Sequence, residues 1–271
     1  MLAWLFARSS DRRFLLRIED LDRVRPGAME RQIGDLEAIG LDWDGEVVRQ
    51  SERTALYAAA VCRLRDAGLT YECFCTRREI RESASAPHGI PGAYPGTCRD
   101  LSQAERSRRR AERPAAIRLR SDVPEFSVQD LLHGDYTGPV DDVVLVRNDG
   151  VPAYNLAVVV DDADQGVDQV VRGDDLLASA PRQAHLCTLL GLRAPTYAHV
   201  ALAVNVRGER LAKRDGSVTL ADLAEAGMKS PDVVARIARS LRMRGRTPVE
   251  MLDEFDPHRV PSSPWSIRSG P

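Results

Sequence analysis

The hydrophobic positions of this 271-residue chain follow both helical and strand-like patterns. Apolar residues recur at helical spacing between Pro26 and Gly40, and a glycine is a common helix terminator. We expect further helices at residues 1–9, 52–67, 101–112, 174–190 and 220–245. Short apolar runs predict strands at residues 13–18, 116–120, 143–146, 157–160 and 167–172.

The order of these elements indicates an α/β fold. The strand at 167–172 enters a helix through Gly173, which is the βα unit of a parallel sheet, and ligands bind at the carboxyl ends of such strands. Turn signals such as His133-Gly134 predict antiparallel hairpins within residues 124–150. From Thr247 onward proline and serine are frequent and apolar order is weak, so we expect residues 247–271 to be a disordered tail.

Composition narrows the class of protein. Hydrophobic content of 43% and charged content of 29% are ordinary for a soluble globular protein, and a net charge of −2 argues against a strongly basic nucleic-acid coat. Five cysteines, an odd number, do not indicate a disulfide scaffold. No signal peptide or bilayer-spanning run is evident, so we expect a cytoplasmic protein without membrane contact.

The basic residues are almost all arginine. Only two of the 38 are lysine, Lys213 and Lys229, which a G+C-rich genome would explain. A compact lysine charge matters at some sites, so a surviving lysine is a candidate for function. Lys213 lies between arginines in a glycine-containing loop, residues 210–217, which could hold phosphates or could be a solvated charged loop.

Two strand ends carry charge that could bind a substrate. Glu19, Asp20 and Asp22 follow the strand at 13–18, and either cap the next helix or offer a carboxylate to a substrate ammonium group. Arg172 ends the strand at 167–172. Its guanidinium could bind a carboxylate in bidentate fashion or pair with the neighbouring aspartates, Asp174 among them.

Three cysteines gather in a segment rich in glycine and proline. Cys73 and Cys75 are followed, after 22 residues, by Cys98. Three thiolates and one further donor would make the closed tetrahedral site of structural zinc. His88 and Tyr94 both compete for the fourth place, and histidine is the commoner zinc ligand; three buried cysteines without metal are the alternative.

The stretch from Arg99 to Arg120 holds eight arginines against three acidic residues. Its central helix is either a solvated face or a contact to an RNA backbone.

The order of these motifs resembles that of the glutamyl-tRNA synthetases, a class I aminoacyl-tRNA synthetase family. Residues 14–22 are similar to the strand "LRIEDTD", 50–53 to "RQSER", 154–157 and 159–162 to "YHLA" and "VVDD", and 171–176 to "VIRG-DLL". Residues 211–214 lie where the "KMSKS" loop belongs. Residues 41–45 (LDWDG), the Cys-x-Cys…Tyr-x-x-x-Cys pattern and the short stretch after Lys213 are typical of the short paralogue family, the glutamyl-queuosine tRNA(Asp) synthetases.

The resemblance implies a reaction and its partners. The paralogue family activates L-glutamate with ATP, supplied with Mg²⁺, and esterifies the glutamyl group to the queuosine base at the wobble position of tRNA(Asp). It implies that Glu19 binds the glutamate ammonium group and that Tyr154 and Arg172 complete the pocket. The resemblance assigns contact with the ATP phosphates to Lys213, within a KMSKS-like loop made of Arg210, Leu211, Ala212, Lys213 and Arg214. It also moves the fourth zinc ligand from His88 to Tyr94, so the expected metal ligands are Cys73, Cys75, Tyr94 and Cys98.

The resemblance also implies a domain plan. We expect a Rossmann-like catalytic domain at residues 1–205 with a zinc-bearing insertion at about 70–112, then the KMSKS-like loop and a helical stem-contact region at 206–246, and a monomer. Family members begin with a strand and a glycine-rich "HIGH" loop, placed just before the helix that here begins at Met1. The given sequence does not include that segment. We expect a start codon further upstream, the alternative being an inactive tRNA- or zinc-binding relative. A truncated translational glutamyl-tRNA synthetase is a further alternative.

Overall fold

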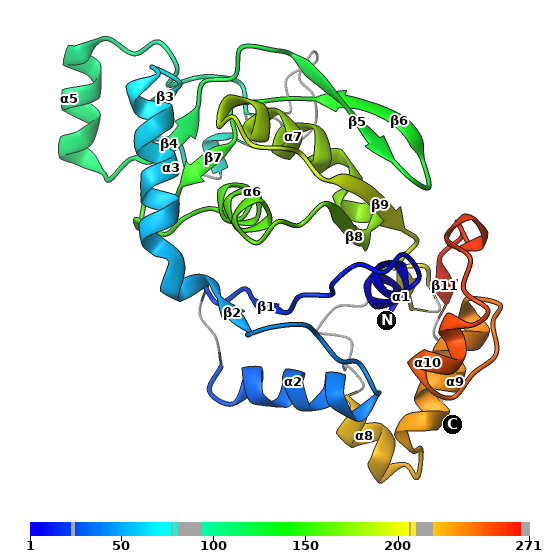
Figure 1. Cartoon of the computed structure of the whole chain (residues 1–271). Helices are drawn as coiled ribbons and strands as arrows, with labels where there is room; N and C mark the ends of the chain where they lie inside the picture. Colours follow the sequence, from blue (N-terminus) through cyan, green and yellow to red (C-terminus); the bar gives the residue numbers. More distant parts are fainter. Residues whose placement is uncertain (23–24, 77, 81–93, 206, 210–218, 267–271) are drawn as a thin grey trace.

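The computed structural model of the chain describes residues 1–22, 25–76, 78–80, 94–205, 207–209 and 219–266, arranged as four small sheets with helices around them (Figure 1). The central sheet has the order β6-β5-β9-β8. Strands β8 (Gln169–Gly173) and β9 (Thr196–Val200) are parallel, and β5 (Glu125–Asp130) joins β9 in the same direction. The predicted βα unit is confirmed, because η2 (Asp174–Ser179) and α7 (Ala180–Leu189) connect the two parallel strands.

A hairpin borders the central sheet. Strand β6 (Gly134–Pro139) runs antiparallel to β5, and the turn between them falls at the predicted His133-Gly134 step. Gly134 has a φ of 72°, a conformation that glycine adopts without steric cost. The hairpin prediction for this region is therefore confirmed.

A second, antiparallel sheet carries the cysteine-rich segment. Its order is β3 (Thr70–Cys73), β4 (Ala116–Leu119) and β7 (Val144–Val146). Helix α5 (Gln103–Glu112) leads into β4 and lies at the far end of the molecule in Figure 1. It begins with a capping box, in which Ser102 and Glu105 each accept a hydrogen bond from the other's backbone N–H.

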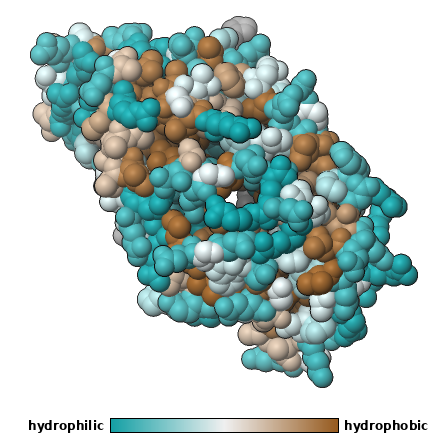
Figure 2. All heavy atoms as spheres, viewed as in Figure 1, coloured by the Kyte–Doolittle hydropathy of each residue, from teal (hydrophilic) through white to brown (hydrophobic). Residues whose placement is uncertain are grey.

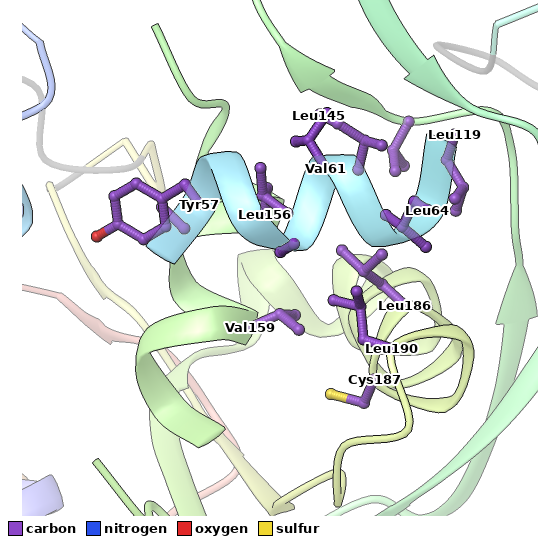
Figure 3. Packing of buried hydrophobic residues seen from close by; sticks show 13 residues of the cluster. Tyr57, Val61, Leu64, Leu119, Leu145, Leu156, Val159, Leu186, Cys187 and Leu190 are labelled. Carbon is purple, nitrogen blue, oxygen red and sulfur yellow. The ribbon is translucent and has the colours of Figure 1, made fainter. Parts of the chain in front are cut away.

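The main hydrophobic core packs three helices together (Figure 3): α3 (Thr54–Asp66), α6 (Tyr154–Asp164) and α7. Leu64, Leu156 and Leu186 come from these three helices and are almost wholly buried. The prediction of a strand at 157–160 is wrong, because these residues lie in α6. Local β propensity is a weak preference, and here burial of successive residues between α3 and α7 decides the conformation.

The N-terminal segment up to Arg49, drawn in blue, lies below the central sheet in Figure 1. Helix α1 (Leu2–Arg8) leads to a two-stranded parallel sheet of β1 (Arg17–Ile18) and β2 (Val48–Arg49). Between these strands lies α2 (Ala28–Ala38), the helix predicted before Gly40. The turn η1 (Gln50–Arg53) then leads into α3.

The C-terminal region is helical and does not end in a disordered tail at 247. It comprises α8 (Leu220–Glu225), α9 (Ser230–Ser240), α10 (Pro248–Leu252) and η4 (Pro257–Arg259), and β11 (Trp265–Ser266) pairs with β10 (Ala203–Val204). Met251 is fully buried with Trp4 and Val234, so burial against α1 and α9 orders a segment whose composition suggested disorder. Residues 267–271 lie outside the described part of the chain. None of the described helices is both long and apolar enough to cross a membrane.

Candidate active site and metal centre

A cavity of about 510 Å³ opens between the N-terminal segment, α6 and β8. Its volume is in the range of small-molecule sites. The face of the molecule seen in Figure 2 is hollowed near its middle, where hydrophilic residues gather. The three residues predicted to bind a substrate, Glu19, Tyr154 and Arg172, all line this one cavity, although they lie up to 153 residues apart in the sequence.

Glu19 is the member of the acidic cluster that faces the cavity. Its carboxylate lies 3.7 Å from a guanidinium nitrogen of Arg17 and its side chain is 47% exposed. Asp20 accepts hydrogen bonds from the backbone N–H and the hydroxyl of Ser51, and Asp22 pairs with Arg147. The latter two acids therefore hold neighbouring segments, which leaves Glu19 as the carboxylate available to a ligand.

Arg172 reaches the cavity from the end of β8. Its Nε donates to Nε2 of His199 at 3.0 Å, and an Nη donates to the carbonyl of Leu176 at 3.4 Å. The next residue is Gly173. Another residue would be crowded at this position, because a Cβ there would lie 2.6 Å from an oxygen of Asp175. The remaining guanidinium N–H groups of Arg172 can bind a carboxylate in the cavity.

Tyr154 begins α6 and is 44% exposed. Partial burial raises the pKa of its hydroxyl, and the nearby charge of Arg172 opposes that rise. The phenol is therefore neutral at physiological pH and can both donate and accept a hydrogen bond.

A buried carboxylate holds together the segments that lie beside the cavity. Asp161 of α6 has no exposed side-chain surface and accepts hydrogen bonds from Gln50, Arg53 and Tyr57, each at a shortest distance of 2.7–2.8 Å. Its neighbour Asp162 lines the cavity and accepts a hydrogen bond of 2.8 Å from Arg17. The segments similar to "RQSER" and "VVDD" thus form one charged network under the site.

The predicted metal ligands converge beside the end of β3. The Sγ atoms of Cys73, Cys75 and Cys98 lie within 4.8 Å of one another. The hydroxyl of Tyr94 is 3.3 Å from the Sγ of Cys73 and 3.6 Å from that of Cys75. Three thiols and one phenol therefore surround one point, as a four-coordinate site requires.

Backbone amides orient this donor set. The N–H of Cys98 donates to the Tyr94 hydroxyl at 2.9 Å, and the N–H of Phe74 donates to the Sγ of Cys98 at 3.5 Å. Burial raises the pKa of the Cys75 thiol to about 12. A bound divalent cation reverses this, because it stabilises the thiolate directly. The residues fit a zinc ion, for which a soft, sulfur-rich and closed site is favourable.

Some predicted residues lie outside the described part of the chain. They are the alternative metal ligand His88 and the KMSKS-like loop of Arg210, Leu211, Ala212, Lys213 and Arg214.

Helix α5 presents arginines to solvent. None of its residues is buried, and among the described residues Arg110 pairs with Glu72 while Arg106 and Arg108 form no ion pair. An exposed guanidinium group that has no ion-pair partner can bind a phosphate.

Two residues at the site were missed in the sequence. Asp130 and His199 are both buried and joined by a hydrogen bond of 2.6 Å, and His199 contacts Arg172 directly. They lie on β5 and β9, far apart in the chain, so only the strand order of the central sheet brings them together. His199 stands out as a polar residue in the mainly apolar strand β9, but Asp130 ends a strand in which polar residues are common, so no signal in the sequence marks it.

Comparison with known proteins agrees with this geometry. Residues 1–259 match the family model described as tRNA synthetases class I (E and Q), catalytic domain. In three dimensions the chain is similar to a glutamate tRNA ligase from Elizabethkingia meningosepticum in complex with its amino acid, with a TM-score of 0.81 and 26% identity over 99% of this chain. The chain spans 63% of the length of that ligase. The fold is therefore the α/β catalytic domain of a class I tRNA synthetase, as predicted.

Relatives of higher identity narrow the family. The chain is 67% identical to the glutamyl-Q tRNA(Asp) synthetase of Nocardia farcinica, over 98% of this chain and 86% of that protein. It is 54% identical to the protein of that name from Cutibacterium acnes, over 89% of this chain and 70% of that protein. The chain belongs to the glutamyl-Q tRNA(Asp) synthetase family, which confirms the resemblance found in the motifs.

Proposed function

We propose that this protein activates L-glutamate with ATP to form glutamyl-adenylate and then transfers the glutamyl group to the queuosine base of tRNA(Asp). The observation that carries the proposal is the shared cavity: an acid, Glu19, and a guanidinium, Arg172, line one ligand-sized space. A free amino acid carries an ammonium group and carboxylates, and these two side chains complement both kinds of charge.

Each residue has a defined role in the proposed complex. Glu19 accepts hydrogen bonds from the glutamate ammonium group, and Arg172 binds a carboxylate through its free N–H groups, assisted by the Tyr154 hydroxyl. Lys213 contacts the ATP phosphates and stabilises the charge that develops as pyrophosphate leaves. Mg²⁺ accompanies the ATP. Positioning two anionic reactants and offsetting their repulsion contribute much of the first step.

We further propose that the insertion is a structural zinc module and part of the RNA-binding surface. The ion would be held by Cys73, Cys75, Tyr94 and Cys98. It would stabilise the module, because it ties together residues that are far apart in the sequence. The unpaired arginines of α5, Arg106 and Arg108, would contact the tRNA backbone. Because its substrate would be a tRNA, we expect the enzyme in the cytoplasm.

The activation step is tested by ATP–pyrophosphate exchange. Exchange that depends on L-glutamate supports the proposal, and the absence of exchange in a folded, glutamate-bound protein contradicts it. A non-catalytic tRNA- or zinc-binding relative gives no exchange.

The transfer step is tested with labelled glutamate. We expect label on tRNA(Asp) that carries queuosine, and none on the same tRNA with guanosine at the wobble position. Label at the 3′ end of tRNA(Glu) would instead identify a translational glutamyl-tRNA synthetase.

A further inference from the structure

A buried polar relay connects β5, β9 and β8. Oδ2 of Asp130 lies 2.6 Å from Nδ1 of His199, and Nε2 of His199 accepts a hydrogen bond of 3.0 Å from Nε of Arg172. The side chains of Asp130 and His199 have no exposed surface. The relay ends at Arg172, and of these three residues it is Arg172 that lines the cavity.

The donors around Asp130 fix its ionisation. Burial would raise its pKa, but hydrogen bonds from His199 and from the backbone N–H groups of Leu132 and His133 outweigh burial and hold the pKa of Asp130 below its ordinary value. Oδ2 also accepts the backbone N–H of His199 at 3.1 Å. Asp130 is therefore an ionised acceptor, which requires His199 to carry its proton on Nδ1.

This tautomer leaves Nε2 as an acceptor, and Arg172 is the group that uses it. An arginine side chain has several rotatable bonds, and anchoring Nε fixes the plane of the whole guanidinium. Tyr197 stacks beside His199 with ring centroids 5.7 Å apart, and the Cζ of Arg172 lies 5.3 Å from the Tyr197 ring, so the guanidinium is held on a second side.

We propose that Asp130 and His199 are positioning residues, which aim the guanidinium of Arg172 at a carboxylate of the substrate. The inference rests on the proposed function, because it takes Arg172 as the carboxylate ligand. The histidine accepts from Arg172 only in the tautomer that Asp130 imposes.

The tautomer can be read directly. In a ¹H–¹⁵N long-range spectrum of protein labelled at histidine, we expect His199 to show a protonated Nδ1 and an unprotonated Nε2 at pH 7.5. A protonated Nε2 would overturn the proposal whatever the variants do.

Variants test the consequence for the substrate. The variant His199→Phe keeps an aromatic ring but loses the Nε2 acceptor for Arg172. Backbone N–H groups still donate hydrogen bonds to Asp130 in this variant. We expect the KM for L-glutamate in pyrophosphate exchange to rise about 10-fold or more, as expected for loss of a hydrogen bond to a charged group, with the KM for ATP within about two-fold of wild type. His199→Gln keeps an acceptor toward Arg172 and should recover most of the glutamate affinity.

Arg172→Ala separates the two proposals. If Arg172→Ala raises the glutamate KM and His199→Phe does not, the positioning role is wrong and the proposed function stands. If Arg172→Ala leaves the glutamate KM unchanged, both are wrong. Equal losses for glutamate and ATP in His199→Phe would indicate a purely structural residue and would also overturn the inference.

Discussion

The Nε of Arg53 donates a hydrogen bond of 2.7 Å to the carboxylate of Asp161, whose side chain is completely buried. The pair joins the start of α3 to the middle of α6, across 108 residues of sequence. Gln50 and Tyr57 complete the shell of donors around the same carboxylate. A buried charge with this many partners is costly to leave unpaired.

Replacing Arg53 with methionine should strongly destabilise the fold. The variant keeps an apolar stem but removes the closest cation of the buried Asp161 and leaves only Arg17, whose Nε lies 3.8 Å away. We therefore expect the free energy of unfolding to fall by up to about 3–5 kcal/mol. Urea denaturation followed by circular dichroism measures it. Arg65→Met, an exposed position on the same helix, is the matched control and should change stability by less than about 0.5 kcal/mol. Similar losses for the two variants would contradict the account of the network.

The cysteine cluster should bind one zinc ion per chain. We expect metal analysis of the purified protein to find zinc near one equivalent, and Tyr94→Phe to weaken zinc binding at least about 10-fold in competition with a chromogenic chelator. The reason is that the phenol supplies the fourth donor beside Cys73 and Cys75.

The control for the metal site is Cys62→Ser. Cys62 is an exposed thiol on α3, outside the cluster, so the variant should keep full zinc content. Zinc affinity that is unaffected by Tyr94→Phe would show that another donor takes the fourth place.

The exposed arginines of α5 should strengthen tRNA binding in a salt-dependent way. Removing one arginine–phosphate interaction lowers the slope of log K against log salt by roughly 0.7–0.9, so Arg106→Ala with Arg108→Ala should lower it by about 1.5. Arg193→Ala, an exposed arginine after α7, is the control. Binding isotherms at several salt concentrations would contradict an RNA-binding role for α5 if the double variant and the control gave the same slope.

Buried neutral histidines predict a pH dependence of stability. Burial lowers the pKa of His199, and Arg172 adds to this, while the hydrogen bond to Asp130 opposes it; His133 also lowers it slightly. The unfolded chain then takes up a proton near pH 6.5 that the folded chain does not, so stability is lost as pH falls below about 6.5.

The contribution of His199 to this pH dependence can be measured by comparing a variant with the wild type. Between pH 6.5 and 5, one such histidine contributes up to about 1.4 kcal/mol per pH unit. We expect His199→Gln to flatten the curve of unfolding free energy against pH by up to this amount relative to wild type. His258→Gln, at an exposed position, should leave the slope unchanged, and an unchanged slope in His199→Gln would show that the folded histidine is protonated.

The sequence was sufficient for much of the site because its chemistry lies in short motifs. Glu19 directly follows β1 and Arg172 lies near the end of β8, and both positions were recognised from their motifs. These strands belong to different sheets, so it is the packing of the two sheets that brings both residues to one cavity. The Cys73-x-Cys75 pair predicted the metal cluster, and Tyr94 rather than a histidine came from the resemblance.

The features that were missed depend on tertiary contacts. The β-forming residues 157–160 became helix because α3 and α7 bury them. Residues near Met251 are ordered by packing against Trp4, at the opposite end of the chain. Asp130 and His199 meet only through the strand order β5-β9-β8, which no local pattern records.

Calorimetric titration of the protein with L-glutamate tests the central claim most directly. We predict binding to wild type, a loss of affinity of at least about 10-fold in Glu19→Gln and in Arg172→Ala, and unchanged affinity in the control Asp22→Asn, whose side chain pairs with Arg147 outside the cavity. Wild-type affinity in both cavity variants, with the fold intact, would contradict a glutamate site between residues 19 and 172.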